Sequence, residues 1–264
     1  MSLLSRRSFL VGCGASTFVL PAHADIGGLV EARFAALVAA YPDLLSSIEG
    51  GQLVWKDGTR MALDDGKTGK TFEQMLRTAS IADQLRQTYR AGKPSATPPA
   101  VNDSPGRIRN EAFFAHMYGD CRKGLTTKNL RAVKWMPKSG AQSLQITRVN
   151  DVAGRMERVI AQLETLPDRL KAFLVPSAGT YNCRVVADTG MPSMHASGAA
   201  IDISTAQSDY WVWAKGKGAQ TIPYRNKIPW EIVEIFEAEK FIWGGKWYHY
   251  DTMHFEYRPE MFAG

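Results

Sequence analysis

Two short segments near the C-terminal end hold the side chains that most constrain the fold. One carries His195 and Asp202 in a His-x6-Asp spacing, and the other carries Asp251 and His254 in an Asp-x2-His spacing. A catalytic zinc site uses three protein ligands, leaves one position open, and needs a base that is not itself a ligand. We therefore expect His195, Asp202 and His254 to meet at one zinc ion per chain. Asp251 is the spare carboxylate, which we expect to act as the general base.

Each of these residues alone would be weak evidence for a metal site. A lone histidine is more often a satisfied polar residue than a ligand, and we interpret His116 and His249 in that way. His249 is the alternative ligand, because it lies in the same segment as His254. The ordered set favours a metal site, since glycines beside it allow the backbone to approach closely.

The N-terminal half shows secondary-structure signals but no functional motif. These signals predict a helix over 28–40, a hairpin over 52–63 that turns at Asp57-Gly58, and a helix from a capping box at 71–74 to about Tyr89. Glycines and prolines then predict an irregular connection over 92–106. We treat residues 25–110 as an N-terminal extension of unknown role.

The second half combines short strands with amphipathic helices. Strands are expected near 133–135, 144–146, 173–175, 199–203, 241–247 and 254–257, and helices over 152–163 and from Pro229 to about Lys240. Asn150 or Asp151 is expected to cap the first of these helices, and Pro167 to end it. The pattern predicts an α+β fold, in which a small, largely antiparallel sheet with packed helices holds the zinc site within residues 111–264.

The N-terminus carries an export signal. A twin-arginine motif, SRRSFL, occupies residues 5–10, and AHA at residues 22–24 fits an A-x-A cleavage site after a short apolar stretch. We therefore expect residues 1–24 to be a twin-arginine-type signal peptide. No later segment reaches the about 18 uninterrupted apolar residues of a membrane span, so we expect no transmembrane segment in the mature chain.

Composition and charge limit the classes of molecule that this chain is expected to bind. Hydrophobic residues make up 45% of the chain, which is enough for a core and argues against global disorder. The net charge is +6, and residues 1–24 contain two arginines and no acid, so the remainder carries +4. This modest surplus suits an anionic partner rich in carboxylates. No basic run with interleaved aromatic residues indicates nucleic-acid binding.

Two cysteines remain once the signal peptide, with Cys13, is removed. An even pair in an oxidising compartment predicts one disulfide between Cys121 and Cys183. The alternative is two separate buried thiols. Cys183 as a catalytic nucleophile is a further alternative, which a disulfide would exclude.

Three linked motifs resemble a known family of enzymes. Ser-x-His-x2-Gly-x-Ala-x-Asp at 193–202 is followed by Trp-Gly-Gly-x-Trp at 243–247 and Asp-x2-His-Phe-Glu at 251–256. Over about residues 174–258 this pattern resembles the zinc D-Ala-D-Ala carboxypeptidase and L-alanyl-D-glutamate endopeptidase family of peptidoglycan metallopeptidases.

The resemblance implies roles for individual residues. It implies zinc on His195, Asp202 and His254, with Asp251 as the general base. Residues 178–184 resemble the family's arginine loop, which implies that Arg184 binds the carbonyl oxygen of the substrate. Further residues are expected to orient the ligands or to line the substrate groove, with a purely structural role as the alternative: Ser193, Glu256, Trp243, Trp247, Tyr250 and Tyr181.

The resemblance also implies a function and a location. We expect an exported enzyme, periplasmic or associated with the cell wall, that hydrolyses a peptide bond in peptidoglycan or muropeptides. Carboxypeptidase and dipeptidase members carry glutamate at the base position, whereas Asp251 matches the endopeptidase branch, which favours an internal L-Ala-D-Glu bond. The alternatives are D,D-carboxypeptidase or D,D-endopeptidase activity, or a wall-binding zinc module without turnover.

Overall fold

The fold is described from a computed structural model that covers residues 26–94, 97–187, 189–214 and 221–262. The signal peptide expected at residues 1–24 lies outside these residues. The structure combines helices with small antiparallel sheets, so the predicted α+β class is confirmed. Among the described residues, no helix is long and apolar enough to cross a membrane.

The N-terminal part consists of helix α1 (Ile26–Ala40) and a three-stranded antiparallel sheet. The sheet contains β1 (Leu45–Glu49), β2 (Gln52–Trp55) and β3 (Arg60–Ala62), in that order. The predicted hairpin is confirmed, and its turn is fixed by a 2.8 Å hydrogen bond from the Thr59 amide to Asp57 Oδ1. The sequence did not predict β1, because its residues LSSIE do not alternate cleanly between apolar and polar.

The helix predicted to run from the capping box to about Tyr89 is two short helices. Helix α2 (Phe72–Thr78) begins at the expected box, in which the Thr71 side chain accepts from the Gln74 amide. Helix α3 (Ile81–Gln84) begins at a second capping box, formed by Ser80 and Asp83. Prediction of one continuous helix was therefore wrong, because the Ser80 side chain caps a new helix start.

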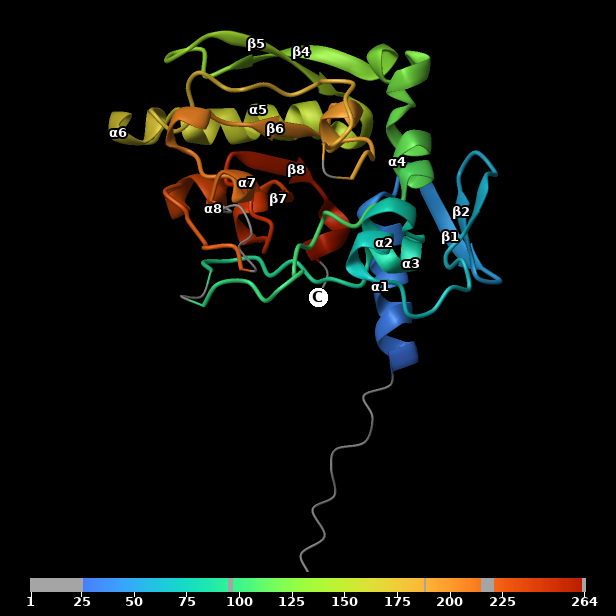
Figure 1. Ribbon diagram of the computed structural model, residues 1–264. Coiled ribbons are helices and arrows are strands. Elements are labelled where there is room, and N and C mark those ends of the chain that lie inside the picture. The colour runs from blue at the N-terminus through green and yellow to red at the C-terminus, as the bar shows by residue number, and fades with distance from the viewer. Residues whose placement is uncertain (1–25, 95–96, 188, 215–220, 263–264) are drawn as a thin grey trace, which may run out of the picture.

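Two predicted strands form the hairpin of β4 (Leu130–Trp135) and β5 (Gln142–Thr147), with Val133 opposite Leu144. Helix α5 (Val152–Leu163) packs on this hairpin on one side and on α8 (Trp230–Ala238) on the other (Figure 1). Its predicted apolar face is buried. Asp151 occupies the predicted N-cap position, but its side chain makes no capping hydrogen bond. The residue is left-handed, with φ 55°, and its carboxylate pairs with Arg158.

The segment before the site also differs from its prediction. Residues 173–175 form no strand, and the short helix α6 (Asp168–Lys171) leads into them. The Leu174 carbonyl accepts a 2.9 Å hydrogen bond from Trp135 Nε1. The apolar residues here fill the core from a turn, which periodicity over so short a run cannot distinguish from a buried strand.

The sheet that positions the site contains β6 (Ala200–Asp202), β7 (Phe241–Trp243) and β8 (His254–Tyr257). All pairings are antiparallel, with β8 in the centre. The strand predicted over 241–247 ends at Trp243, because Gly244–Lys246 forms a 3-10 turn. The remaining helices are α4 (Glu111–Tyr118) and α7 (Trp211–Ala214), with further 3-10 turns at Cys121–Lys123, Thr126–Asn129, Val149–Asp151, Met194–Ser197, Thr205–Gln207 and Pro259–Phe262.

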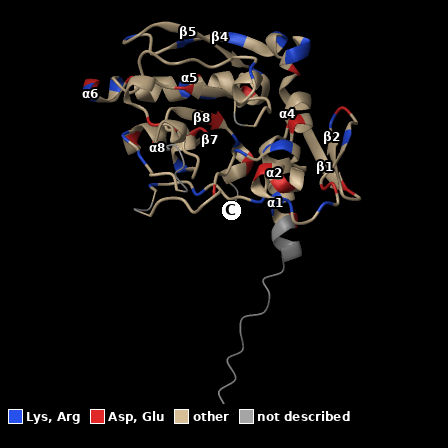
Figure 2. Cartoon of the chain, in the orientation of Figure 1, with Lys and Arg blue, Asp and Glu red and all other residues tan. Residues whose placement is uncertain are grey.

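One continuous core joins the N-terminal part to the rest of the chain. Leu37 and Trp55 belong to the same buried cluster as Trp135 and Phe255. Tyr41, at the end of α1, donates a 2.6 Å hydrogen bond to Glu260 near the C-terminal end. Figure 2 shows acidic and basic residues interspersed along the chain.

Candidate metal centre and catalytic cavity

The chain brings the three predicted ligands together through one sheet and one turn. Asp202 on β6 lies directly opposite His254 on β8. His195 lies on the 3-10 turn Met194–Ser197 that leads into β6. Gly198 ends this turn with φ 67°, and a Cβ there would lie 2.5 Å from Leu130 Cδ2, so glycine is required for the reversal.

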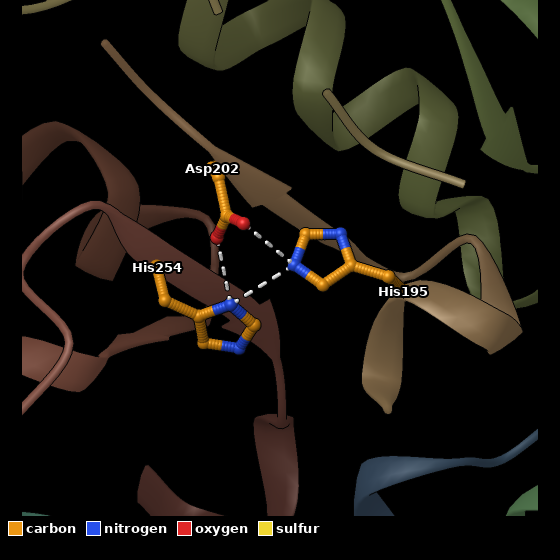
Figure 3. Close-up of side chains that lie close together, drawn as sticks. All are labelled: His195, Asp202 and His254. Atoms are coloured by element: carbon orange, nitrogen blue, oxygen red, sulfur yellow. Dashed lines mark hydrogen bonds and ion pairs between the residues drawn. The ribbon is translucent and has the colours of Figure 1, made fainter. Parts of the chain in front are cut away.

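The ligand atoms of these residues converge on one point (Figure 3). His195 Nε2 lies 3.2 Å from His254 Nδ1 and 3.2 Å from Asp202 Oδ2. His254 Nδ1 lies 3.0 Å from Asp202 Oδ1. Among the described residues, this is the group of His, Cys, Asp and Glu side chains placed to hold a metal ion, with its ligand atoms within 4.8 Å of one another.

The outer nitrogen of each imidazole has a partner that can only accept. His195 Nδ1 contacts the Thr180 carbonyl, and His254 Nε2 lies 3.0 Å from Glu256 Oε2. Each outer nitrogen therefore carries the proton, which leaves a lone pair on each inner nitrogen. Two nitrogen lone pairs and a carboxylate that face one another can bind a cation. Three donors of these types match the ligands of a catalytic metal site, which leaves a further position open.

Electrostatics show how strongly the centre favours positive charge. Burial lowers the pKa of His254, but its hydrogen bonds to Asp202 and Glu256 outweigh burial and raise that pKa to about 10. Burial raises the pKa of Asp202, but the two imidazoles outweigh it and hold that pKa well below its usual range. A proton and a metal ion therefore compete for the same centre.

Glu256 is the partner that orients His254. It is fully buried, and its Oε1 atom accepts a 2.9 Å hydrogen bond from Arg258 Nη1. Burial alone would raise the pKa of Glu256, but His254, Arg109 and Arg258 lower it to about 2. Glu256 therefore stays ionised and holds the imidazole in one orientation, as carboxylates next to metal-bound histidines do.

Asp251 lies in the loop that precedes β8. Its amide donates to the Gly244 carbonyl at 3.0 Å, which fixes the backbone beside the cavity. Within the described part of the chain, its shielded Oδ1 atom has no hydrogen-bond partner. Burial first, and then the charge of Asp202, raise the pKa of Asp251 to about 6. A carboxyl group with a pKa near neutrality suits a general base.

The ligands and Asp251 open onto one cavity of about 260 Å³. Four further predicted residues line it with them: Arg184, Ser193, Trp247 and Glu256. The Trp247 ring centroid lies 5.6 Å from that of His254. Further described side chains around the cavity are Arg107, Arg109, Val186, Ala187, Thr189, Met194, Tyr210, Trp213 and Met253.

A disulfide and backbone hydrogen bonds hold the Arg184 loop beside the metal cluster. Cys183 forms a disulfide with Cys121, which follows α4. Backbone hydrogen bonds join the Asn182 amide to the His195 carbonyl and the Ser193 amide to the Arg184 carbonyl, each at 3.1 Å. Ser193 also accepts from the His195 amide through its hydroxyl, so it shapes the turn that presents the ligand.

Several predicted residues lie away from the cavity. Trp243 and Tyr250 are buried and donate to the carbonyls of Thr252 and Pro223, respectively. Tyr181 is half-buried and does not line the cavity.

The two histidines interpreted as structural are outside the metal cluster. His116 pairs with Asp57 at 2.9 Å. His249 stacks on Phe72 and contacts the Ser104 hydroxyl.

Sequence reasoning missed Arg107 and Arg109. They come from the end of the irregular connection, yet both line the cavity. The available signal was the run PGRIR at residues 105–109, in which two arginines flank an apolar residue after a turn.

Comparison with known proteins covers the region of the site. Residues 187–257 match a family model described as D-alanyl-D-alanine carboxypeptidase. The matched range includes the three predicted ligands and Asp251, and it stops short of Arg184 and of the N-terminal part. No curated protein and no solved structure matches the chain. At the level of the broad family, the match supports a peptidase of the peptidoglycan metallopeptidase type.

Proposed function

We propose that this protein is a zinc-dependent peptidase that hydrolyses a peptide bond in peptidoglycan stem peptides, with the L-Ala-D-Glu bond as the favoured target. One observation carries the proposal. Three acceptor groups converge on one point beside a carboxyl group, and all of them open onto the same cavity. This arrangement combines a metal site with a base that is not a ligand.

Each residue of the site has a separate role in the proposed reaction. His195, Asp202 and His254 hold the zinc ion, which when bound supplies Lewis acidity that activates water near neutral pH. Asp251 accepts a proton from the attacking water and passes it to the leaving amine. Arg184 stabilises the negative charge that develops on the carbonyl oxygen, a type of contact worth about 3–4 kcal/mol. The Thr180 carbonyl and Glu256 keep the two imidazoles in place.

A purely structural zinc site fits these residues less well. Structural sites are normally closed by four protein ligands. Among the residues that the structure describes, the converging group has three members and borders a cavity of about 260 Å³, which leaves room for a substrate.

The alternatives differ in the bond that is cut. Asp251 at the base position favours the endopeptidase reaction, whereas the matched family model is named for the carboxypeptidase reaction. D,D-endopeptidase activity and a wall-binding module without turnover are the other two alternatives. The three hydrolytic activities make different products from the same substrate, and a binding module makes none.

Purified muropeptides incubated with the mature protein, with and without a chelator, distinguish these cases by mass spectrometry. We expect cleavage between L-alanine and D-glutamate that stops when metal is removed. Release of free D-alanine would instead identify a carboxypeptidase, and separation of crosslinked peptides a D,D-endopeptidase. Wall binding without any product would contradict the proposed hydrolysis.

We also propose that the chain is exported by the twin-arginine route. The Cys121–Cys183 disulfide fits an oxidising compartment, and a cell-wall substrate requires export. Replacing Arg6 and Arg7 with lysine should leave the precursor unprocessed in the cytoplasm. Normal processing of that variant would exclude the route.

A further inference from the structure

We propose that Arg107 and Arg109 form an anion subsite in the catalytic cavity, and that this subsite binds a carboxylate group of the substrate. The inference rests on the proposed function, because it assigns part of the same cavity to substrate recognition. It also gives the N-terminal part of the chain a role at the site.

The segment that carries both arginines is built into the wall of the cavity. Residues 104–108 are buried although they form neither helix nor strand. Gly106 has φ 105°, and a Cβ there would lie 2.5 Å from Ile242 Cδ1 and 3.1 Å from Glu256 Oε1. The Gly106 carbonyl also accepts a 3.1 Å hydrogen bond from Arg258. The segment is therefore fixed against the sheet that carries His254.

Backbone carbonyls hold the two guanidinium groups beside the cavity. Arg109 Nη1 donates to the Gly106 carbonyl at 3.1 Å and Nη2 donates to the Pro192 carbonyl at 3.4 Å. Arg107 Nη1 donates to the His249 carbonyl at 3.4 Å. Arg109 lies 3.8 Å from Glu256 Oε2, which places it next to the partner of His254. These contacts restrict both side chains before any substrate arrives, so less entropy is lost on binding.

The cavity carries charged side chains that can bind an anion. Among the described residues, the guanidinium groups of Arg107, Arg109 and Arg184 line it, together with the carboxyl groups of Asp202, Asp251 and Glu256. A divalent cation held by His195, Asp202 and His254 would add positive charge to this set. Arginine binds carboxylates through two parallel hydrogen bonds, and stem peptides carry free carboxylates. In this proposal Arg184 contacts the carbonyl oxygen, and Arg107 and Arg109 contact the carboxylate while keeping the contacts that hold them beside the cavity.

Binding of two matched peptides tests the subsite. The probes are L-Ala-γ-D-Glu-meso-diaminopimelate-D-Ala with free carboxylates, and the same peptide with its carboxyl groups amidated. Calorimetry uses the full mature chain with zinc, in an Asp251→Asn background that prevents turnover. We expect the carboxylate form to bind about tenfold more tightly or better, since charged hydrogen bonds are lost with the amide.

Variants then assign the preference to these residues. Arg107→Gln and Arg109→Gln should bring the ratio of the two affinities close to one. Arg131→Gln is the matched control, because Arg131 lies on β4 and pairs with Glu157 at the surface. It should keep the preference. Where a glutamine variant does not fold, the lysine variant replaces it and should reduce the preference several-fold, since lysine lacks the bidentate fork.

The outcomes separate this inference from the proposed function. Absence of any carboxylate preference in the Asp251→Asn protein would overturn the subsite, as would a full preference in variants of both arginines. Hydrolysis of muropeptides without such a preference would support the proposed function and contradict the subsite. A preference that depends on Arg107 and Arg109, in a protein that hydrolyses nothing, would support the subsite and contradict the proposed function.

Discussion

At the scale of single residues, Glu256 orients His254, one of the predicted metal ligands, through the ring nitrogen that points away from the cluster. It accepts from His254 Nε2 at 3.0 Å and leaves Nδ1 as the ligand atom. Glu256→Gln removes the charge that fixes this orientation, so zinc affinity should fall by about 10–100-fold. Competition with a fluorescent chelator measures this, with Glu157→Gln at the surface as the control. An unchanged affinity in Glu256→Gln would show that His254 is oriented by other groups.

Asp251 is the residue that should separate binding from chemistry. Asp251→Asn keeps the size of the side chain but cannot accept a proton near neutral pH, so turnover should fall by about 100-fold or more. Zinc content and wall binding should be retained, whereas Asp202→Asn should lose zinc. If Asp251→Asn loses zinc and Asp202→Asn keeps it, ligand and base are exchanged.

The pH dependence of the reaction follows from the same group. Burial and the charge of Asp202 raise the pKa of Asp251 to about 6, and only the deprotonated carboxylate can act as a base. Activity should therefore be lost as pH falls through the pKa, and be retained above it. A bound cation lowers this pKa, so the acid limb of kcat/KM should lie at or below about pH 6. An acid limb that stays in place in Asp251→Asn would assign it to another group.

At the scale of elements, the disulfide holds the Arg184 loop against the turn after α4. The bonded cysteines are separated by 62 residues, and closing a loop of that length stabilises a protein by about 2–5 kcal/mol. Replacing Cys121 and Cys183 with serine should lower the free energy of unfolding by this amount, measured by denaturant titration. Activity should also fall because Arg184 loses its tether. Equal stability of variant and parent would mean that the bond is absent in the folded protein.

The sequence predicted the elements whose patterns are local. The apolar face of α5 and the alternation in β4 and β5 are visible in their own residues, and their structures agree. Competition between local signals decided the rest: Ser80 starts a second helix, and Asp151 takes the N-cap position but pairs with Arg158 and makes no capping hydrogen bond. The residues at 173–175 fill the core from a turn, where tertiary packing decides.

The site residues also divide into those with a local sequence motif and those placed by tertiary packing. The ordered motifs predicted that His195, Asp202 and His254 would meet. The structure brings them together because two of them lie on paired strands and the third lies on the turn before one of these strands. Arg107 and Arg109 reach the cavity from a segment with no periodic signal. Their position depends on a buried, irregular path that only the complete fold specifies.

At the scale of the whole molecule, a chain of buried polar groups joins α1 to the metal centre. Tyr41 donates to Glu260, Arg258 binds both Glu260 and Glu256, and Glu256 holds His254. Buried charges of this kind are costly unless every partner is present. The N-terminal helix therefore contributes to the centre through its packing and through this network.

Tyr41→Phe tests that connection with the smallest change. It removes the hydroxyl that donates to Glu260 at 2.6 Å and leaves a buried carboxylate with one partner fewer, so the free energy of unfolding should fall by about 1–3 kcal/mol. Tyr118→Phe is the matched control, since Tyr118 is equally buried and, within the described part of the chain, its hydroxyl accepts one long hydrogen bond, 3.5 Å from Asn150 Nδ2. Denaturant titration of both variants measures the difference, and zinc affinity should decrease in Tyr41→Phe alone. Equal losses in the two variants would show that Tyr41 contributes only as a core side chain and that α1 does not support the metal centre through Glu260.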